Sequence, residues 1–301
     1  MFGVSIIVPL YNKERTIADT VESILEQSDP RFEVIVVDDG SQDASVAKLA
    51  GQADRINLIQ QANAGPSAAR NRGAVEAKYD VLAFADADDR LDRHFVARHL
   101  KIREHHPDVQ LSINSFEVIR DGTVGRTEHV QKRIADDLHD DVVLDVVRAE
   151  CISNVHSSGF CIDRSVFDAS GGYTEDLRCW EITEALLRFA LHSERMALLA
   201  DVLSQKFEED DENSQFERFR SNVDQYMLYC QCLMRSMPEL CEASRSRFGR
   251  ELQSCCSRLL RQRKFRQFVG FMNTVQADPA ISTSVQLSWR TQLAYRMLRL
   301  I

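Results

Sequence analysis

The sequence lacks the features that define several classes of protein. Only 18 of its 301 residues are glycine or proline and 28% are charged, which excludes a fibrous and a disordered chain. No apolar run approaches the ~20 residues that span a bilayer. The first residues also lack the basic stretch of a secretory signal, so we expect a cytoplasmic protein.

Cysteines are present, but not in a pattern that binds zinc. The eight cysteines form no Cys-x-x-Cys pair and no spacing typical of zinc ligands. Cys255 and Cys256 are adjacent, which is a poor geometry for a disulfide bond. We therefore expect reduced thiols, many of them buried, as is usual for a cytoplasmic protein.

Positive charge is scarce overall, because the net charge is −9. This balance argues against nucleic-acid binding, which depends on neutralising phosphates. The charge is uneven: residues 241–301 hold 11 Lys/Arg and 3 Asp/Glu, whereas residues 1–240 carry a net charge of −17. The basic segment has three interpretations, namely a solvated helical face, a packed helical cap or dimer interface, and a peripheral contact with anionic lipid or an acidic partner.

Short apolar runs alternate with helical patterns in the first 90 residues. The predicted strands are 4–8, 32–37, 56–60 and 81–85, and the predicted helices are 17–25, 44–50 and 68–77. This alternation predicts an α/β fold with a doubly wound, mainly parallel sheet. We expect Pro9 to end the first strand and Ser67 to cap the third helix.

The rest of the chain divides near residue 210. Helical patterns are predicted over 91–106 and 181–191, and strands within 109–119, near 155–162 and over 196–207. The acidic run 208–212 is the best candidate for a linker, and the sequence reads as helical from Phe216 onward. We therefore predict an α/β domain over residues 1–210 and a basic helical region over residues 211–301.

Carboxylates follow two of the predicted strands directly. Asp38 and Asp39 end the second strand, and Asp86-x-Asp88 ends the fourth. Ligands of such sheets bind beyond the carboxyl ends of the strands. Two carboxylates at a turn can hold Mg²⁺ or Mn²⁺, whose remaining ligands would be phosphate oxygens and water. The alternative for each pair is an ordinary turn or a helix cap.

Four ordered blocks together resemble the family 2 glycosyltransferases of GT-A fold. The blocks are VSIIVPLYN at residues 4–12, EVIVVDDGS at 33–41, NAGPSAARNRG at 63–73 and DADD at 86–89. The resemblance is strong over about residues 3–95 and weaker to about residue 207. It implies a Rossmann-like GT-A domain with a nucleotide-sugar half over 1–95 and an acceptor half over 96–210.

The resemblance also implies roles for individual residues. It predicts that the donor, favoured as a UDP-sugar, is bound by Pro9, Tyr11, Asp39, Asn63, Gly65, Arg70 and Asp86. Asp88, together with Asp86, would hold a divalent cation, Mn²⁺ or Mg²⁺. Such a cation stabilises the charge that develops on a leaving diphosphate. Arg70 or Arg72 could assist, although arginines on a helix are more often only solvated.

An inverting transfer needs a base that deprotonates the acceptor hydroxyl. In the family this base is the Asp of a Glu-Asp pair after a Gly-Gly-aromatic turn. The segment GGYTEDLRCWEI at residues 171–182 fits the surroundings, but Ile182 occupies the Asp position and cannot accept a proton. Three interpretations stay open: Glu181 is the base, Glu184 is the base, or the chain either binds donor without ordinary transfer or uses a base that belongs to the acceptor.

Two further residues have a functional and a structural interpretation. His156 is expected near the acceptor side of the cleft, where a satisfied structural histidine is the commoner case. Trp180 could stack against an acceptor sugar or pack into the core.

The sequence thus predicts an inverting, metal-dependent glycosyltransferase that acts on a saccharide or lipid-linked acceptor. The resemblance suggests cell-surface polysaccharide or glycolipid synthesis, at the inner face of the membrane if the basic region binds lipid, with a homodimer as an alternative use of that region. The rival interpretation is a catalytically silent nucleotide-sugar-binding subunit, because of Ile182.

Overall fold

The structure is a computed structural model of the chain. It describes residues 1–133, 139–145, 155–208, 222–236, 242–277 and 288–298. The chain divides into two compact units, one of residues 1–176 with 188–211 and one of residues 177–187 with 212–301. The division falls inside a helix, and the domain boundary expected near residue 210 stays a prediction. No helix among the described residues is long and apolar enough to cross a bilayer.

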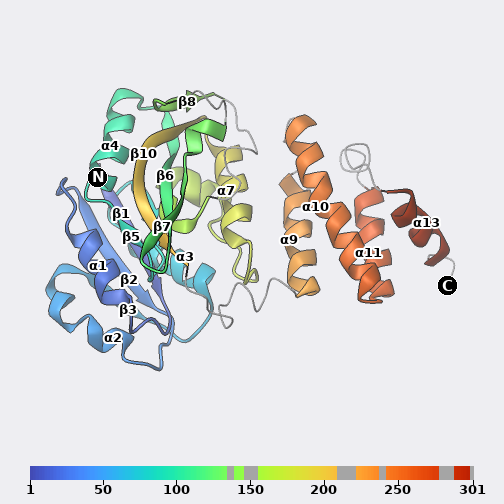
Figure 1. Ribbon diagram of the computed structural model, residues 1–301, viewed down its shortest axis with the longest axis horizontal. Coiled ribbons are helices and arrows are strands. Elements are labelled where there is room, and N and C mark those ends of the chain that lie inside the picture. The colour runs from blue at the N-terminus through green and yellow to red at the C-terminus, as the bar shows by residue number, and fades with distance from the viewer. Residues whose placement is uncertain (134–138, 146–154, 209–221, 237–241, 278–287, 299–301) are drawn as a thin grey trace. The chain divides into compact units, whose positions relative to one another are not determined.

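Ten strands of the described residues form one sheet in the first unit (Figure 1). They are β1 (Val4–Leu10), β2 (Phe32–Asp38), β3 (Asn57–Gln60), β4 (Val81–Phe84), β5 (Arg90–Leu91), β6 (Val109–Arg120), β7 (Thr123–Glu128), β8 (Val142–Leu144), β9 (Phe160–Asp163) and β10 (Arg195–Phe207). The main strand order is β3-β2-β1-β4-β9-β6-β10-β5. The first four strands are parallel, as predicted, and β6 is parallel to β10. The second half is mixed, because β9 runs antiparallel between β4 and β6.

Helices cover both faces of this sheet. Those of the first unit and its border are α1 (Ile17–Leu25), α2 (Ser45–Lys48), α3 (Pro66–Glu76), α4 (Phe95–His105), α6 (Arg164–Ser170) and α7 (Glu181–His192), with the 3-10 turns η1 (Ala50–Arg55), η2 (Val130–Arg133) and η3 (Ser157–Gly159). Ile6 and Val8 of β1 join one buried cluster with apolar residues of α1 and α4. On the opposite face Gly73 lets α3 approach β1, since a Cβ there would lie 2.4 Å from Ile7 Cγ2. The apolar runs of β1 and β4, and most of that of β2, are thus buried on both sides, whereas the edge strand β3 is half-exposed.

The expectation that Pro9 ends the first strand is wrong, because β1 continues to Leu10. The carbonyl of Ile7 accepts a bond from Ala85 on the β4 side, and that of Leu10 accepts one from Asp39 on the β2 side. Since a parallel strand bonds alternately to its two neighbours, the nitrogen of Pro9 faces the β4 side, where pairing ends at Ile7. The missing N–H of the proline therefore removes no ladder bond.

The expectation that Ser67 caps the third helix is also wrong. Helix α3 begins at Pro66, with Gly65 as its N-cap at φ 98°. Proline is favoured at the first helical position, where its fixed φ suits the helix and its missing N–H has no partner to lose. Ser67 is therefore buried inside the first turn.

A buried polar network joins α4 to the centre of the sheet. The two ring nitrogens of His99 lie 2.7 Å from Ser112 Oγ and 3.1 Å from Asn114 Oδ1. Arg103 donates to the same Ser112 oxygen and to Asp163. Burial and the Arg103 charge lower the pKa of His99 to about 3, so its ring is neutral.

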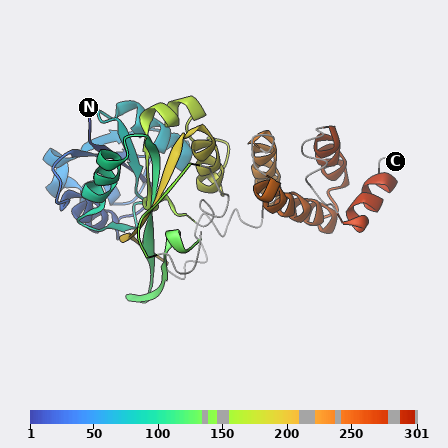
Figure 2. The same cartoon turned by 90° about the horizontal axis from the view of Figure 1, so that it is seen from above.

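The second unit contains only helices in the residues that the structure describes (Figure 2). Beyond the first part of α7 they are α9 (Val223–Ser236), α10 (Glu242–Arg261), α11 (Phe265–Ala277) and α13 (Trp289–Leu298). Leu252, Cys255 and Leu259 form a buried apolar stripe on α10, and Phe268 and Phe271 of α11 are buried too. The helices of the basic region thus have a buried apolar interior, and the interpretations of its basic surface stay predictions. Most of the expected linker, residues 209–212, lies outside the described residues, as do residues 285–287 and 299–301 of the region expected to be helical.

Candidate donor and metal site

The candidate site lies where β1, β2 and β4 end. Since these strands are parallel, their carboxyl ends meet at one edge of the sheet. Tyr11, half-buried, follows β1, and Asp39 follows β2. Lys13, in the loop after β1, pairs with Asp88, in the loop after β4, at 2.5 Å between Nζ and Oδ2. The predicted donor and metal segments are therefore neighbours in the structure.

Asp39 organises the loop between β3 and α3. Its buried carboxylate accepts hydrogen bonds from the backbone N–H of Ala64 (2.8 Å) and Gly65 (2.7 Å) and from Gln61 Nε2 (2.8 Å). Asn63 Nδ2 also donates to the Asp39 carbonyl, at 3.0 Å. A carboxylate has about four acceptor positions, so Asp39 keeps one that a donor base could use.

Arg70 and Asp86 form a second anchor. Arg70 projects from α3 and is buried, and its guanidinium donates to Asp86 Oδ1 at 2.8 Å. The same guanidinium lies 5.3 Å from the centre of the Tyr173 ring. Burial acts to raise the pKa of the Asp86 carboxyl, but the charge of Arg70 and its hydrogen bond hold that pKa below its usual value. Asp86 is thus an oriented anion.

Asp88 differs from Asp86 in its electrostatics. Burial and the charge of neighbouring Asp89 raise the pKa of its carboxyl above the usual value, although the Lys13 ammonium opposes the shift. Like-charged carboxylates crowded together stabilise a cation between them. The loop after β4 therefore concentrates the negative charge that a metal site requires.

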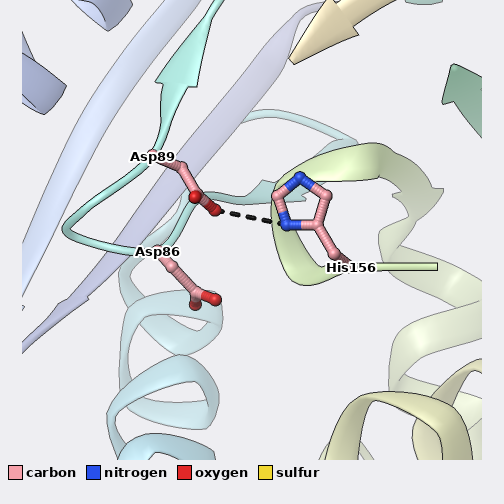
Figure 3. Close-up of side chains that lie close together, drawn as sticks. All are labelled: Asp86, Asp89 and His156. Atoms are coloured by element: carbon pink, nitrogen blue, oxygen red, sulfur yellow. Dashed lines mark ion pairs between the residues drawn. The ribbon is translucent and has the colours of Figure 1, made fainter. Parts of the chain in front are cut away.

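Asp89 and His156 were not predicted as a pair, and the structure brings them together (Figure 3). Asp89 Oδ2 lies 3.2 Å from His156 Nδ1 and accepts a bond from Ser158 Oγ at 2.5 Å. The backbone N–H of Asp86 donates to the same serine oxygen, at 3.0 Å. These bonds tie the turn η3 to the end of β4.

Three side chains at this point could hold a cation. One ligand atom each of Asp86, Asp89 and His156 lies within 4.8 Å of the others. Two carboxylates and an imidazole are ligands that Mn²⁺ accepts, and the carboxylates suit Mg²⁺. The residues present therefore fit a divalent cation; Asp88, whose carboxylate pairs with Lys13, is not one of the three. Of these three residues the sequence analysis named Asp86 as a ligand, and the role of Asp88 as a ligand stays a prediction.

The two candidate bases lie in the first turn of α7. Glu181 is the first residue of this helix and half-buried, and Glu184 is buried. The N–H of Glu184 donates to the Trp180 carbonyl, at 3.0 Å. Both glutamates belong to the second compact unit, whereas Asp86 and Asp88 belong to the first. Which glutamate, if either, is the base stays a prediction.

A cavity of about 590 Å³ lies elsewhere in the first unit. It is lined by residues of α1, β5 and β10 and their neighbours, among them Ser23, Arg90 and Gln205. None of the predicted donor or metal residues lines it. The cavity has carboxylates of its own, such as Asp19, Glu22 and Glu117, whereas the predicted donor and metal carboxylates and the candidate cation site lie at the strand ends.

A sheet with parallel strands, paired carboxylates at their ends and a candidate cation site places this chain among the α/β proteins whose ligand site lies at the carboxyl ends of the strands. Residues 5–154 match the family model described as glycosyl transferase family 2. This part of the chain belongs to that family, which confirms the resemblance read from the sequence.

Two curated relatives illustrate how far the sequence similarity extends. Glycosyltransferase GlyA of Streptococcus pneumoniae is 38% identical over 110 residues, which cover 35% of this chain and 16% of the relative. An uncharacterized glycosyltransferase of Nostoc sp. is 32% identical over 171 residues, 55% of this chain and 52% of the relative. The matched part is thus a sixth to a half of these relatives.

Solved structures extend the similarity in fold to nearly the whole chain. S. aureus TarS 1-349 superimposes with a TM-score of 0.62 at 16% identity, covering 99% of this chain and 90% of that one. The same protein in complex with UDP-GlcNAc gives a TM-score of 0.59 at 18% identity, covering 99% and 79%. This likeness identifies the fold as GT-A, as the sequence predicted.

Proposed function

We propose that the chain is an inverting glycosyltransferase that moves a sugar from a nucleoside-diphosphate donor, in the first instance a UDP-sugar, to a hydroxyl acceptor. The observation that carries the proposal is the meeting of Asp39, Arg70–Asp86 and Asp88 at one sheet edge within a family 2 segment. The complexes of TarS with UDP-GlcNAc and UDP support the choice of donor.

Each residue has a defined task in this proposal. Asp39 holds the loop that borders the base pocket and accepts a bond from the base. Arg70 keeps Asp86 ionised and oriented toward the ribose and the cation. A divalent cation, held by Asp88 with Asp86 and with Asp89 and His156 nearby, would neutralise the negative charge that develops on the leaving diphosphate.

Glu181 is the base that we propose, since it is more accessible than buried Glu184. It takes the proton of the acceptor hydroxyl as the oxygen attacks the anomeric carbon, on the face opposite the diphosphate. We further propose a saccharide or lipid-linked acceptor in cell-surface polysaccharide or glycolipid synthesis. The chain could reach such an acceptor as a peripheral protein.

The test is the binding of UDP by calorimetry with and without Mn²⁺, for the wild type and for Asp88→Ala and Glu181→Gln. The proposal predicts that Mn²⁺ strengthens UDP binding, that Asp88→Ala removes this effect, and that Glu181→Gln preserves it. UDP binding that ignores Mn²⁺ and Asp88 alike would refute the metal assignment.

A second candidate is a silent nucleotide-sugar-binding subunit, and Ile182 favours it. Such a subunit would bind UDP in the same way but would release no UDP from UDP-GlcNAc.

Turnover that survives in Glu181→Gln but fails in Glu184→Gln would instead identify Glu184 as the base.

A further inference from the structure

The segment that leads into α7 is built into the C-terminal helices. Residues 177–187 form one compact unit with residues 212–301. Leu177 and Cys179 are buried, and the backbone N–H of Arg178 donates to Gln225 Oε1 of α9 at 2.8 Å. The C-terminal helices, which lie beyond the family match, therefore contact the residues just before Glu181.

An aromatic cluster forms the centre of this contact. The Trp180 ring stacks on Tyr229 of α9, with centroids 5.6 Å apart and planes inclined by 23°, and lies 5.0 Å from the ring of Tyr226. Both tyrosines are buried and lie three residues apart, on one face of α9. We call Trp180, Tyr226 and Tyr229 the Trp180 clamp. Aromatic pairs of this kind contribute ~0.5–1.5 kcal/mol each beyond the area that they bury.

Two residues of helix α10 contact Tyr226 of the Trp180 clamp. The Tyr226 hydroxyl is hydrogen-bonded to the Glu251 carboxylate, and the Arg258 guanidinium lies 4.1 Å from the centre of the Tyr226 ring. Arg258 is one of the residues that make the C-terminal segment basic. Part of that positive charge therefore serves contacts inside the helical unit.

The backbone of Trp180 is strained. Its φ is 64°, in the left-handed region that bulky residues rarely adopt. Such a conformation costs ~1–3 kcal/mol and persists only where the surroundings enforce it. The carbonyl of this residue accepts the first helical bond of α7, from Glu184. The conformation of Trp180 thus sets where α7 begins and how its first turn is oriented.

We propose that the Trp180 clamp positions the first turn of α7 for catalysis, so that the C-terminal helices are part of the catalytic apparatus. This inference rests on the proposed function, and it assigns positioning roles to Trp180, Tyr226 and Tyr229. The clamp stabilises the strained backbone, and the strained backbone orients the glutamate that takes the acceptor proton.

The first experiment compares Tyr229→Ala with Tyr229→Phe in the full chain. Tyr229→Ala should lower kcat for UDP release from UDP-GlcNAc by about tenfold or more, which is the effect of a misplaced catalytic group. Affinity for UDP with Mn²⁺ should change by less than about twofold, and Tyr229→Phe should restore kcat because it keeps the ring. An unchanged kcat in Tyr229→Ala, or a loss of kcat only in proportion to a loss of UDP affinity, overturns the inference.

Phe271→Ala is the matched control for stability. It removes a buried aromatic ring from α11 in the same unit, so it should lower the melting temperature to a similar extent. Its kcat at a temperature where both variants are folded should stay near the wild-type value. An equal fall of kcat in Phe271→Ala would show a merely structural effect and overturn the inference.

The second experiment asks whether the clamp acts through Glu181. In a Glu181→Gln background, Tyr229→Ala should cause no further loss of kcat, since effects that act through one group are not additive. Losses that multiply overturn the inference. A wild-type chain that releases no UDP overturns the proposed function itself, and the inference with it. An active wild type with a fully active Tyr229→Ala variant overturns the inference alone.

Discussion

Asp39 offers the sharpest single perturbation of the candidate site. The substitution Asp39→Asn preserves the shape of the side chain but replaces one carboxylate oxygen with an amino group. In the native structure both oxygens accept bonds, one from Gly65 N–H and the other from Ala64 N–H and Gln61 Nε2. Whichever way the amide turns, an N–H₂ group faces a backbone N–H.

The cost follows from these bonds. Losing a bond to a charged group costs ~1.5–3 kcal/mol, and the N–H of Gly65 is buried, so water cannot replace the lost acceptor. The bonds that remain become neutral and weaken by a few tenths of a kcal/mol each. We expect a total of about 3 kcal/mol, which for a unit of this size lowers the melting temperature by roughly 6–12 °C.

The assay is thermal unfolding of the wild type, Asp39→Asn and a control, together with UDP binding. Asp54→Asn is the control, because Asp54 is exposed and the change in charge is the same. It should stay within about 0.5 kcal/mol of the wild type. Asp39→Asn should also weaken UDP binding at least about tenfold. A melting temperature of Asp39→Asn equal to that of the control would refute the role of Asp39 in holding the loop.

Further predictions concern charge. Asp88→Asn should raise the free energy of unfolding by ~0.5–1 kcal/mol in the absence of added metal, because burial and the charge of Asp89 disfavour the ionised form of Asp88. The same variant should lose UDP release. A variant less stable than the wild type would contradict this prediction. Arg70→Lys should lower the free energy of unfolding by ~1–3 kcal/mol and weaken UDP binding, since an ammonium cannot reproduce the planar contact of the guanidinium with Asp86. A variant that unfolds in urea and binds UDP like the wild type would contradict this prediction. The pKa of His99 rises from about 3 in the folded protein to 6.5 on unfolding, so its contribution to stability is complete above pH 6.5 and is lost as the pH falls. The free energy of unfolding should therefore be lower by ~2 kcal/mol at pH 5 than at pH 7. His99→Gln should flatten this pH dependence in urea-unfolding experiments.

Most of the parallel half of the sheet could be predicted because β1, β2 and β4 are apolar runs that are largely buried on both faces. The elements that were missed lack such a signal. Strand β5 has two residues, and β7 is exposed along nearly its whole length. Helix α6 spans seven residues, too few to show a helical period, and the glycine that follows it is the only local sign of its end. The end of β1 was predicted wrongly because a proline interrupts a strand only when its nitrogen faces a neighbouring strand that would bond there.

The candidate site was only partly visible in the sequence for a similar reason. Asp39, Asp86 and Asp88 follow strands directly, so their position at the sheet edge could be inferred from the strands alone. The contact of His156 with Asp89 depends on where the chain returns to the sheet through η3 and β9, which no local pattern encodes. The Trp180 clamp could not be predicted either, because its tyrosines belong to α9, which lies beyond the family match.

The central claim is that this chain transfers sugar with a cation held at Asp88. The most direct measurement is UDP release from UDP-GlcNAc by the wild type and Asp88→Ala, each with Mn²⁺ and with a chelator. The account predicts release by the wild type with Mn²⁺, and at most ~1% of that rate in the other three reactions. Metal-dependent UDP binding without release from the donor, with water or any saccharide acceptor, would contradict it and identify a silent nucleotide-sugar-binding subunit.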